Sequence, residues 1–245
     1  MPRSSPAGVA GWIRSPIRFD VRTAPDATKL RLLSAAEILL TERGVDGMSI
    51  RALAAAAGTS VSAVHYHFGS KFALVASLFE ARLVPINRAR LSGLESLVTA
   101  AAPASPTLEK VLDAFLRPSF EAWRAGEAIG RTATPHLLAQ LHADRFPGLE
   151  ELKERLFQPV FGRYLEVVSE ILPEQSTSAL RIGLTYVSGM LLHTVGGHIE
   201  VAGVADAPRS GRDSNEALLR YLVDFSVAGL RGAGAVGGTR MEGLE

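Results

Sequence analysis

Apolar side chains recur every three or four positions along most of the chain, which is the spacing of one face of an α-helix. The first clear example covers residues 26–43, with Asp26 as a suitable N-cap and Gly44 as a typical helix end. Its apolar side consists of Leu32, Ala35, Ala36, Leu39 and Leu40. No segment alternates apolar and polar residues as a half-buried strand does. The pattern predicts an all-α protein.

Two short helices are predicted directly after the first one. Ser49 and Ser60 are good N-caps for short apolar stretches, and Ser70 can cap a long helix that follows. The short helices cover about residues 50–57 and 61–67, and neither is stable alone. Both must therefore pack against the helices on either side of them. This is the layout of a helix-turn-helix, whose second helix enters the major groove of DNA.

Helical spacing returns after the prolines at positions 103 and 106. It predicts helices over about 107–125, 128–143, 148–171, 175–202 and 214–231. The first 25 residues contain four prolines and little periodicity, which predicts a flexible arm. Residues from 232 onward are rich in glycine and are predicted to form a disordered tail. The chain thus divides into an arm (1–25), a helix-turn-helix domain (26–72), a larger helical domain (73–231) and a tail (232–245).

Charge distinguishes the two domains although the net charge is only +1. Residues 1–91 hold 12 Lys+Arg against 6 Asp+Glu, whereas residues 92–245 hold 14 against 19. A basic front third indicates a polyanionic partner for that end of the protein. The chain has no cysteine, which excludes a disulfide framework, a thiol nucleophile and zinc sites built on cysteine. No segment approaches the roughly 18 consecutive apolar residues of a membrane span, so we expect no membrane association.

Residues 35–74 resemble the DNA-binding domain of TetR-type bacterial repressors. The stretch reads AAEILLTERGVDGMSIRALAAAAGTSVSAVHYHFGSKFAL. Several parts match in order: the Ala-Ala pair, the turn at Gly44, Ser49-Ile50, the Ala56-Ala57-Gly58 end and Phe68-Gly69-Ser70-Lys71. The resemblance implies a cytoplasmic, ligand-responsive transcriptional regulator, most often a repressor, that binds a palindromic operator in double-stranded DNA. The string HYHFGSK and residues 82–88 also resemble a fatty-acid-responsive subgroup of the PsrA type.

The resemblance implies specific DNA contacts. Ser49 and Arg51 would lie near the phosphate backbone, and so would His67 and Lys71. His65 stands where the family most often has tyrosine. The expected contacts are Ser49, Arg51, Ser60, Val61, Ser62, Ala63, His65, Tyr66, His67 and Lys71. The base-facing positions among them, 61, 62, 63 and 66, are mostly apolar, which favours methyl contacts and hydroxyl readout over bidentate arginine pairs.

The resemblance also implies that residues 73–231 enclose a small hydrophobic effector, such as a fatty acid or an acyl-CoA, and pair two copies of the chain. Polar or aromatic residues on apolar helices are the candidates for the pocket: Phe115, Phe120, Trp123, Arg131, His136, Phe157, Phe161, Tyr164, Tyr186, Met190 and His193. A cation such as Arg131 or His136 would suit a carboxylate. The homodimer would form through helices 175–202 and 214–231, whose small and apolar residues include Gly183, Val187, Gly189, Leu191, Leu222, Phe225 and Ala228.

We expect no catalytic residue, no cofactor and no metal site. The chain has no phosphate-cradling glycine loop and no GxSxG motif. The histidine pairs at 65/67 and 193/198 lack the i,i+4 spacing of a helical metal site. Two alternatives remain open: a helical small-molecule-binding protein and a helical enzyme, each with no role on DNA. Salt-dependent binding to DNA would distinguish a regulator from both.

Overall fold

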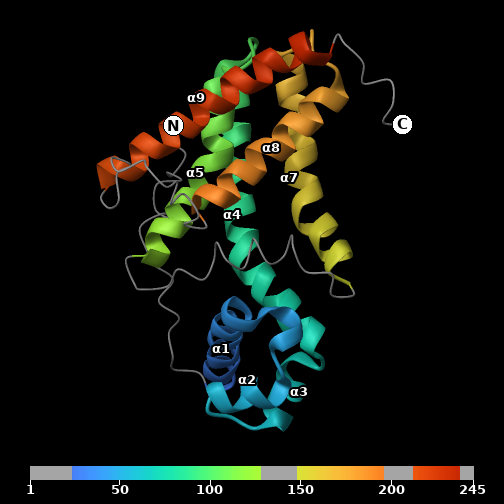
Figure 1. The fold of residues 1–245 in the computed structure, drawn as a ribbon, viewed down its shortest axis with the longest axis vertical. Helices are drawn as coiled ribbons and strands as arrows, with labels where there is room; N and C mark the ends of the chain where they lie inside the picture. The colour runs from blue at the N-terminus through green and yellow to red at the C-terminus, as the bar shows by residue number, and fades with distance from the viewer. Residues whose placement is uncertain (1–23, 128–147, 196–211, 238–245) are drawn as a thin grey trace, which may run out of the picture.

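A computed structural model describes residues 24–127, 148–195 and 212–237, and helices account for nearly all of them (Figure 1). The helices are α1 (Ala24–Gly47), α2 (Ile50–Ala56), α3 (Val61–Phe68), α4 (Lys71–Ala101), α5 (Leu108–Glu127), α7 (Leu149–Ile171), α8 (Thr177–Val195) and α9 (Arg212–Gly237). No strand occurs within these ranges. The predicted all-α class, with a helix-turn-helix domain in front of a larger helical domain, is confirmed.

Local sequence determines where the front helices begin and end. Ser49, Ser60 and Ser70 cap α2, α3 and α4, and each hydroxyl accepts a hydrogen bond from the backbone N–H three residues further on, at 3.1, 3.2 and 3.1 Å. Gly44 has φ 68°, which interrupts α1 where the sequence predicted its end. Gly69, with φ 72°, ends α3 and turns the chain into α4.

The front part has one apolar core under α1, α2, α3 and the first turns of α4. Its residues include Leu32, Leu53, Val64 and Leu74, each at most 1% exposed. The N-terminal end of α7 contributes to the same core through Leu149 and neighbouring leucines. The front part is therefore held by two helices, α4 and α7, that both continue into the rest of the molecule (Figure 1).

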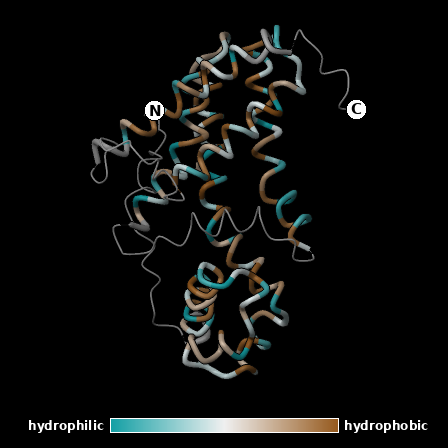
Figure 2. Tube along the Cα trace, viewed as in Figure 1, coloured by the Kyte–Doolittle hydropathy of each residue, from teal (hydrophilic) through white to brown (hydrophobic). Residues whose placement is uncertain are grey.

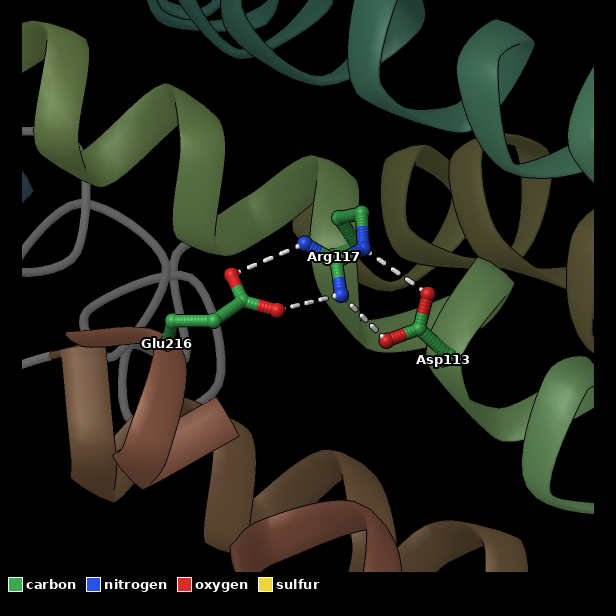
Figure 3. A network of polar contacts seen from close by, with 3 residues as sticks. All are labelled: Asp113, Arg117 and Glu216. Carbon is green, nitrogen blue, oxygen red and sulfur yellow. Dashed lines mark hydrogen bonds and ion pairs between the residues drawn. The ribbon is translucent and has the colours of Figure 1, made fainter. Parts of the chain in front are cut away.

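The back part is a helical bundle of α5, α7, α8, α9 and the remainder of α4. Hydrophobic and hydrophilic positions are interspersed along these helices, so each one contributes a stripe to the core (Figure 2). A polar network joins α5 to α9, in which Arg117 donates to both Asp113 and Glu216 at 2.7 and 2.8 Å (Figure 3). The arginine lowers the pKa of Glu216, so this link persists over the neutral pH range.

Some helix ends differ from the prediction. α9 continues to Gly237 rather than ending near residue 231, so the glycine-rich stretch from Gly232 begins inside a helix. Alanines alternate with glycines there, and a helix that already exists can extend through them at small cost. Several predicted segments lie outside the described residues: most of the arm, the helix 128–143, the end of the helix 175–202 and residues 238–245. No helix in the described ranges has the length and apolarity to cross a membrane.

Candidate nucleic-acid interface and effector cavity

The helix α3 has one buried side and one exposed side. Val64 and Phe68 anchor it in the front core, at 1% and 8% exposure. The opposite side presents Tyr66, which is 85% exposed. Also exposed there are Val61, Ser62 and His65, while Ala63 is half-buried. The helix-turn-helix therefore projects most of the base-facing positions into solvent, where a major groove could receive them.

The residues expected near phosphates surround this helix. Ser49 and Arg51 are exposed at the start of α2, and Lys71 lies at the start of α4 with part of its side chain exposed. His67 is half-buried at the end of α3. The structure thus places cationic and polar groups on both sides of α3, which is the arrangement that fixes the register of a recognition helix on DNA.

Three of these side chains form hydrogen bonds at the ends of α3 that the sequence did not indicate. The Nδ1–H of His65 donates to the carbonyl oxygen of Gly69 at 3.0 Å, which closes the C-terminal end of α3. The hydroxyls of Ser60 and Ser62 lie 2.9 Å apart and share a hydrogen bond at its N-terminal end. These contacts hold α3 in shape at both ends.

The back part contains a cavity of about 270 Å³ among α4, α5, α7 and α8. Its wall is mostly apolar, as small-molecule sites in proteins usually are. The lining residues are Leu83, Ile86, Arg90, Phe115, Ser119, Phe157, Val160, Phe161, Thr185, Ser188, Gly189, Leu191 and Leu192.

The structure places only some of the expected pocket residues at this cavity. Phe161 lines it, as do Phe115 and Phe157. The rest of the expected set that the structure describes lies elsewhere: Phe120, Trp123 and Met190 pack into the back core, Tyr164 is fully buried, Tyr186 is 69% exposed on α8 and His193 is exposed. Arg131 and His136 lie outside the described residues. Helical periodicity shows that a residue faces inward but not which neighbouring helices it meets, and this is why the expected set includes residues away from this cavity.

The cavity has a cation that the sequence analysis did not select, Arg90 on α4. It is only 6% exposed. Its Nε donates to the carbonyl oxygen of Phe115 at 2.8 Å, its Nη1 to Oδ1 of Asn87 at 3.2 Å and its Nη2 to Oγ of Ser119 at 2.9 Å. The guanidinium also lies 4.5 Å from the centre of the Phe115 ring. The signal was present in the sequence, because Asn87 and Arg90 fall on the same helical stripe as Leu83, Ile86 and Leu94.

The charge on Arg90 persists despite its burial. Desolvation lowers the pKa of Arg90 to about 10, which leaves the group protonated at neutral pH. Tyr164 packs beneath it, with its hydroxyl donating to the carbonyl oxygen of Arg90 at 2.9 Å, and burial raises the pKa of Tyr164. Asn87 in turn donates from Nδ2 to the carbonyl oxygen of Leu156 on α7 at 2.7 Å. Arg90 is therefore the centre of a polar cluster that joins α4, α5 and α7.

Comparisons with protein families match both parts of the chain. Residues 32–78 match the family described as bacterial regulatory proteins, tetR family. Residues 113–229 match the tetracyclin repressor-like C-terminal domain. The two matches together span more than half of the chain. No curated protein matches the chain in sequence.

Solved structures share the fold over most of the chain at low sequence identity. A protein of Pseudomonas aeruginosa PAO1, described as a transcriptional regulator, has 19% identity and a TM-score of 0.61, with 89% of this chain and 95% of that chain covered. The fatty acid degradation regulator FadR from Bacillus halodurans has 19% identity and a TM-score of 0.53, covering 83% and 96%. FadR from Bacillus subtilis in complex with stearoyl-CoA has 16% identity and a TM-score of 0.53, covering 82% and 98%. At these identities the likeness concerns the fold.

Proposed function

Because this chain belongs to the TetR family of bacterial regulatory proteins, a family of transcription regulators with a helix-turn-helix domain, we propose that it is a cytoplasmic, ligand-responsive repressor. It binds a palindromic operator in double-stranded DNA as a homodimer and leaves the DNA when a small hydrophobic effector binds in the back part. The observation that carries this proposal is that one helix, α4, begins directly after α3 and forms part of the cavity wall.

Specific residues are proposed for the DNA contacts. Val61, Ser62, Ala63 and Tyr66 read base edges, because α3 exposes this side beyond its buried anchors. The flanking groups contact phosphates and fix the register; they are Ser49, Arg51, Ser60, His65, His67 and Lys71. With no arginine among the base-facing residues, methyl groups of thymine and single hydroxyl or phenol contacts dominate the readout.

The proposed dimer forms through α8 and α9. Tyr186 on α8 and Tyr221 on α9 are each 69% exposed, and Phe225 is 55% exposed. The rings of Tyr221 and Phe225 stack with their centres 6.4 Å apart on one side of α9. Large exposed aromatic groups mark interaction surfaces. We propose a second copy as the partner, because binding to a palindrome requires two recognition helices about 34–36 Å apart and each chain supplies one.

The structure refines which residues could pair in that dimer. Val187, Leu191 and Leu222 are at most 6% exposed and belong to the protomer's own core. Gly183 packs inward too, since a Cβ on it would lie 2.5 Å from the side chain of Leu230. The remaining candidates, Gly189, Phe225 and Ala228, are exposed.

The proposed effector site is the cavity beside α4. Leu83 and Ile86 line the cavity and also belong to the front core, so an occupant touches the same side chains that support the DNA-binding part. Release requires that the effector bind the released state more tightly than the DNA-bound state, and such coupling is typically about 1–3 kcal/mol. An acyl-type effector fits the apolar wall, and a fatty-acid-responsive role like that of the PsrA type is part of this proposal.

DNA binding by the full-length protein tests the proposal. The probe is the DNA upstream of its own gene, and fluorescence anisotropy is measured over a range of salt concentrations. We expect Lys71→Ala to weaken binding to every sequence and to lower the slope of log affinity against log salt by about one unit per protomer, because one phosphate contact is lost. Lys110→Ala, which changes an exposed lysine on α5, is the matched control and should bind as the unchanged protein does. Binding that does not respond to salt would contradict the proposal and favour a small-molecule-binding protein or an enzyme.

A further inference from the structure

We infer that the cavity binds a free hydrophobic monocarboxylic acid, with its carboxylate on Arg90, in preference to the acid's CoA thioester. This inference rests on the proposed function, since it names the chemical class of the effector for the cavity described above. A buried cation in an apolar wall distinguishes this cavity from an ordinary gap in a helical bundle.

Arg90 has hydrogen-bond partners but no partner charge among the described residues. Its three contacts go to a backbone carbonyl, an amide oxygen and a hydroxyl, all of which are neutral. A guanidinium carries five N–H donors, so one donor on each Nη remains beyond these contacts. A buried charge is costly unless it is paired and hydrogen-bonded, and an anion in the cavity would supply both.

The other polar groups in the wall cannot replace Arg90 as donors. The hydroxyl of Thr185 donates to the carbonyl oxygen of Arg181 at 2.9 Å, and that of Ser188 donates to the carbonyl oxygen of Leu184 at 3.0 Å. The hydroxyl of Ser119 accepts from Arg90 and keeps its own O–H donor, but it is neutral and lies beside the guanidinium. Within the described part of the wall, the guanidinium is therefore the one charged donor for a polar head group.

A carboxylate matches this donor better than a thioester does. An arginine and a carboxylate form paired, charge-assisted hydrogen bonds, which are roughly twice as strong as neutral ones. A thioester offers a neutral carbonyl and would leave the guanidinium charge unpaired. The rest of the wall is aliphatic and aromatic, so the remainder of the ligand must be apolar.

The size of the cavity points to a modest ligand. Its volume of about 270 Å³ is close to the lower end of the roughly 300–1,000 Å³ range for small-molecule sites. It exceeds the roughly 150 Å³ of an apolar cavity that binds benzene. The apolar part of a medium-chain fatty acid or of an aromatic acid with one or two rings suits a cavity of this size.

The position of Arg90 connects head-group binding to the helices. The two Nη atoms that would hold the carboxylate also donate to Asn87 and Ser119, and Asn87 in turn holds α7 through the carbonyl oxygen of Leu156. The carboxylate thus binds where α4, α5 and α7 are joined. Its arrival alters contacts on both helices that support the front part.

Isothermal titration calorimetry with the full-length protein tests the inference without DNA. The probes are hexanoate, octanoate, decanoate, dodecanoate and naphthoate, each compared with its primary alcohol and its CoA thioester. We expect at least one acid to bind about tenfold or more tightly than its alcohol and its thioester, which is the range of a charge-assisted hydrogen-bond pair. Arg90→Gln should remove this preference, and Arg88→Gln, which changes an exposed arginine on the same helix, should keep it.

A second variant leaves the Arg90 cluster intact. A Cβ on Gly189 meets no atom within 4 Å, so Gly189→Leu can add a side chain at the cavity wall and should abolish binding of the acids while the circular dichroism spectrum is unchanged. If Arg90→Gln does not fold, Gly189→Leu and the ligand comparison decide the question. The inference is overturned if no acid binds, if alcohol or thioester binds as tightly as the acid, or if folded Arg90→Gln keeps the preference. None of these outcomes bears on salt-dependent DNA binding, which is the test of the proposed function.

Discussion

At the scale of single residues, Gly148 determines how closely α7 can approach the DNA-binding part. It precedes α7 with φ 88°, a conformation that favours glycine. A Cβ at this position would lie 2.9 Å from both Cε2 and Cζ of Phe72. Phe72 stands in the first turn of α4, directly after α3. The glycine therefore lets the start of α7 rest on the Phe72 ring, which lies in the first turn of the helix after α3.

Gly148→Ala should lower the free energy of unfolding by about 2 kcal/mol. The left-handed backbone costs roughly 1 kcal/mol for alanine, and displacing the Phe72 ring adds a similar overpacking cost. Urea denaturation at a fixed protein concentration measures the change. Gly162→Ala on α7 is the matched control, because this glycine is helical and its added Cβ would approach only the flexible end of the Gln158 side chain, at 3.4 Å. The control should be neutral or up to about 1 kcal/mol more stable, and equal effects of the two substitutions would refute this explanation.

At the scale of elements, a buried ion pair fastens α1 to α4. Glu37 on α1 is 3% exposed, and both of its carboxylate oxygens accept from Arg82 on α4, with the Nε contact at 3.0 Å. Such a two-point contact fixes both distance and orientation. Because α4 continues from Arg82 to the cavity residues Leu83 and Ile86, the pair connects the first helix of the DNA-binding part to a helix that lines the cavity.

Arg82→Met should destabilise the protein by about 2–4 kcal/mol, because it leaves the buried carboxylate of Glu37 without a partner. Water can reach part of Arg82, whose side chain is 23% exposed, and this places the expected loss toward the lower end. The double variant Glu37→Leu with Arg82→Met should recover most of the loss, since no buried charge remains. Urea denaturation of both variants and of Glu37→Leu completes the cycle, and simple additivity would exclude a coupled pair.

The helix starts could be predicted from the sequence, whereas the residues of the cavity wall could not. The starts of α2, α3 and α4 follow from Ser49, Ser60 and Ser70, because capping is a contact within one turn of chain. The cavity wall is different, because Tyr164 and Phe161 belong to the same helix yet only Phe161 reaches the cavity. Arg90 was not selected because its partners on α5, Phe115 and Ser119, are distant in the sequence. A polar residue on an apolar stripe can be assigned to a cavity only when the neighbouring helices are known.

At the scale of the whole molecule, two helices run from the DNA-binding part to the cavity. α4 places Leu83 and Ile86 in both the front core and the cavity wall. α7 places Leu156 in the front core and Phe157 and Val160 at the cavity. A ligand that displaces the cavity residues of α4 or α7 would therefore move a helix that also packs in the front core with α3. In the proposed dimer, two copies held at a fixed separation would convert such a movement into a loss of fit to a palindrome.

The double variant Tyr221→Asp with Phe225→Asp should convert the proposed dimer into a monomer. The two side chains are exposed and stacked on α9, so the protomer can accept the change, whereas an interface would bring the new charges of two copies together. Sedimentation should give the mass of one chain. Operator affinity should fall by about a hundredfold or more, because the second recognition helix no longer binds as part of the same molecule.

Binding of a carboxylate by this variant separates the two functions of the back part. Arg90 and the described cavity wall lie within one protomer, so the best-bound acid should retain its affinity while operator binding is lost. Gln158→Asp, an exposed change on α7, is the control and should leave mass, DNA binding and ligand binding unaltered. A variant that stays dimeric would show that the stacked aromatic pair lies outside the interface. A monomer that no longer binds the acid would show that the partner copy completes the cavity.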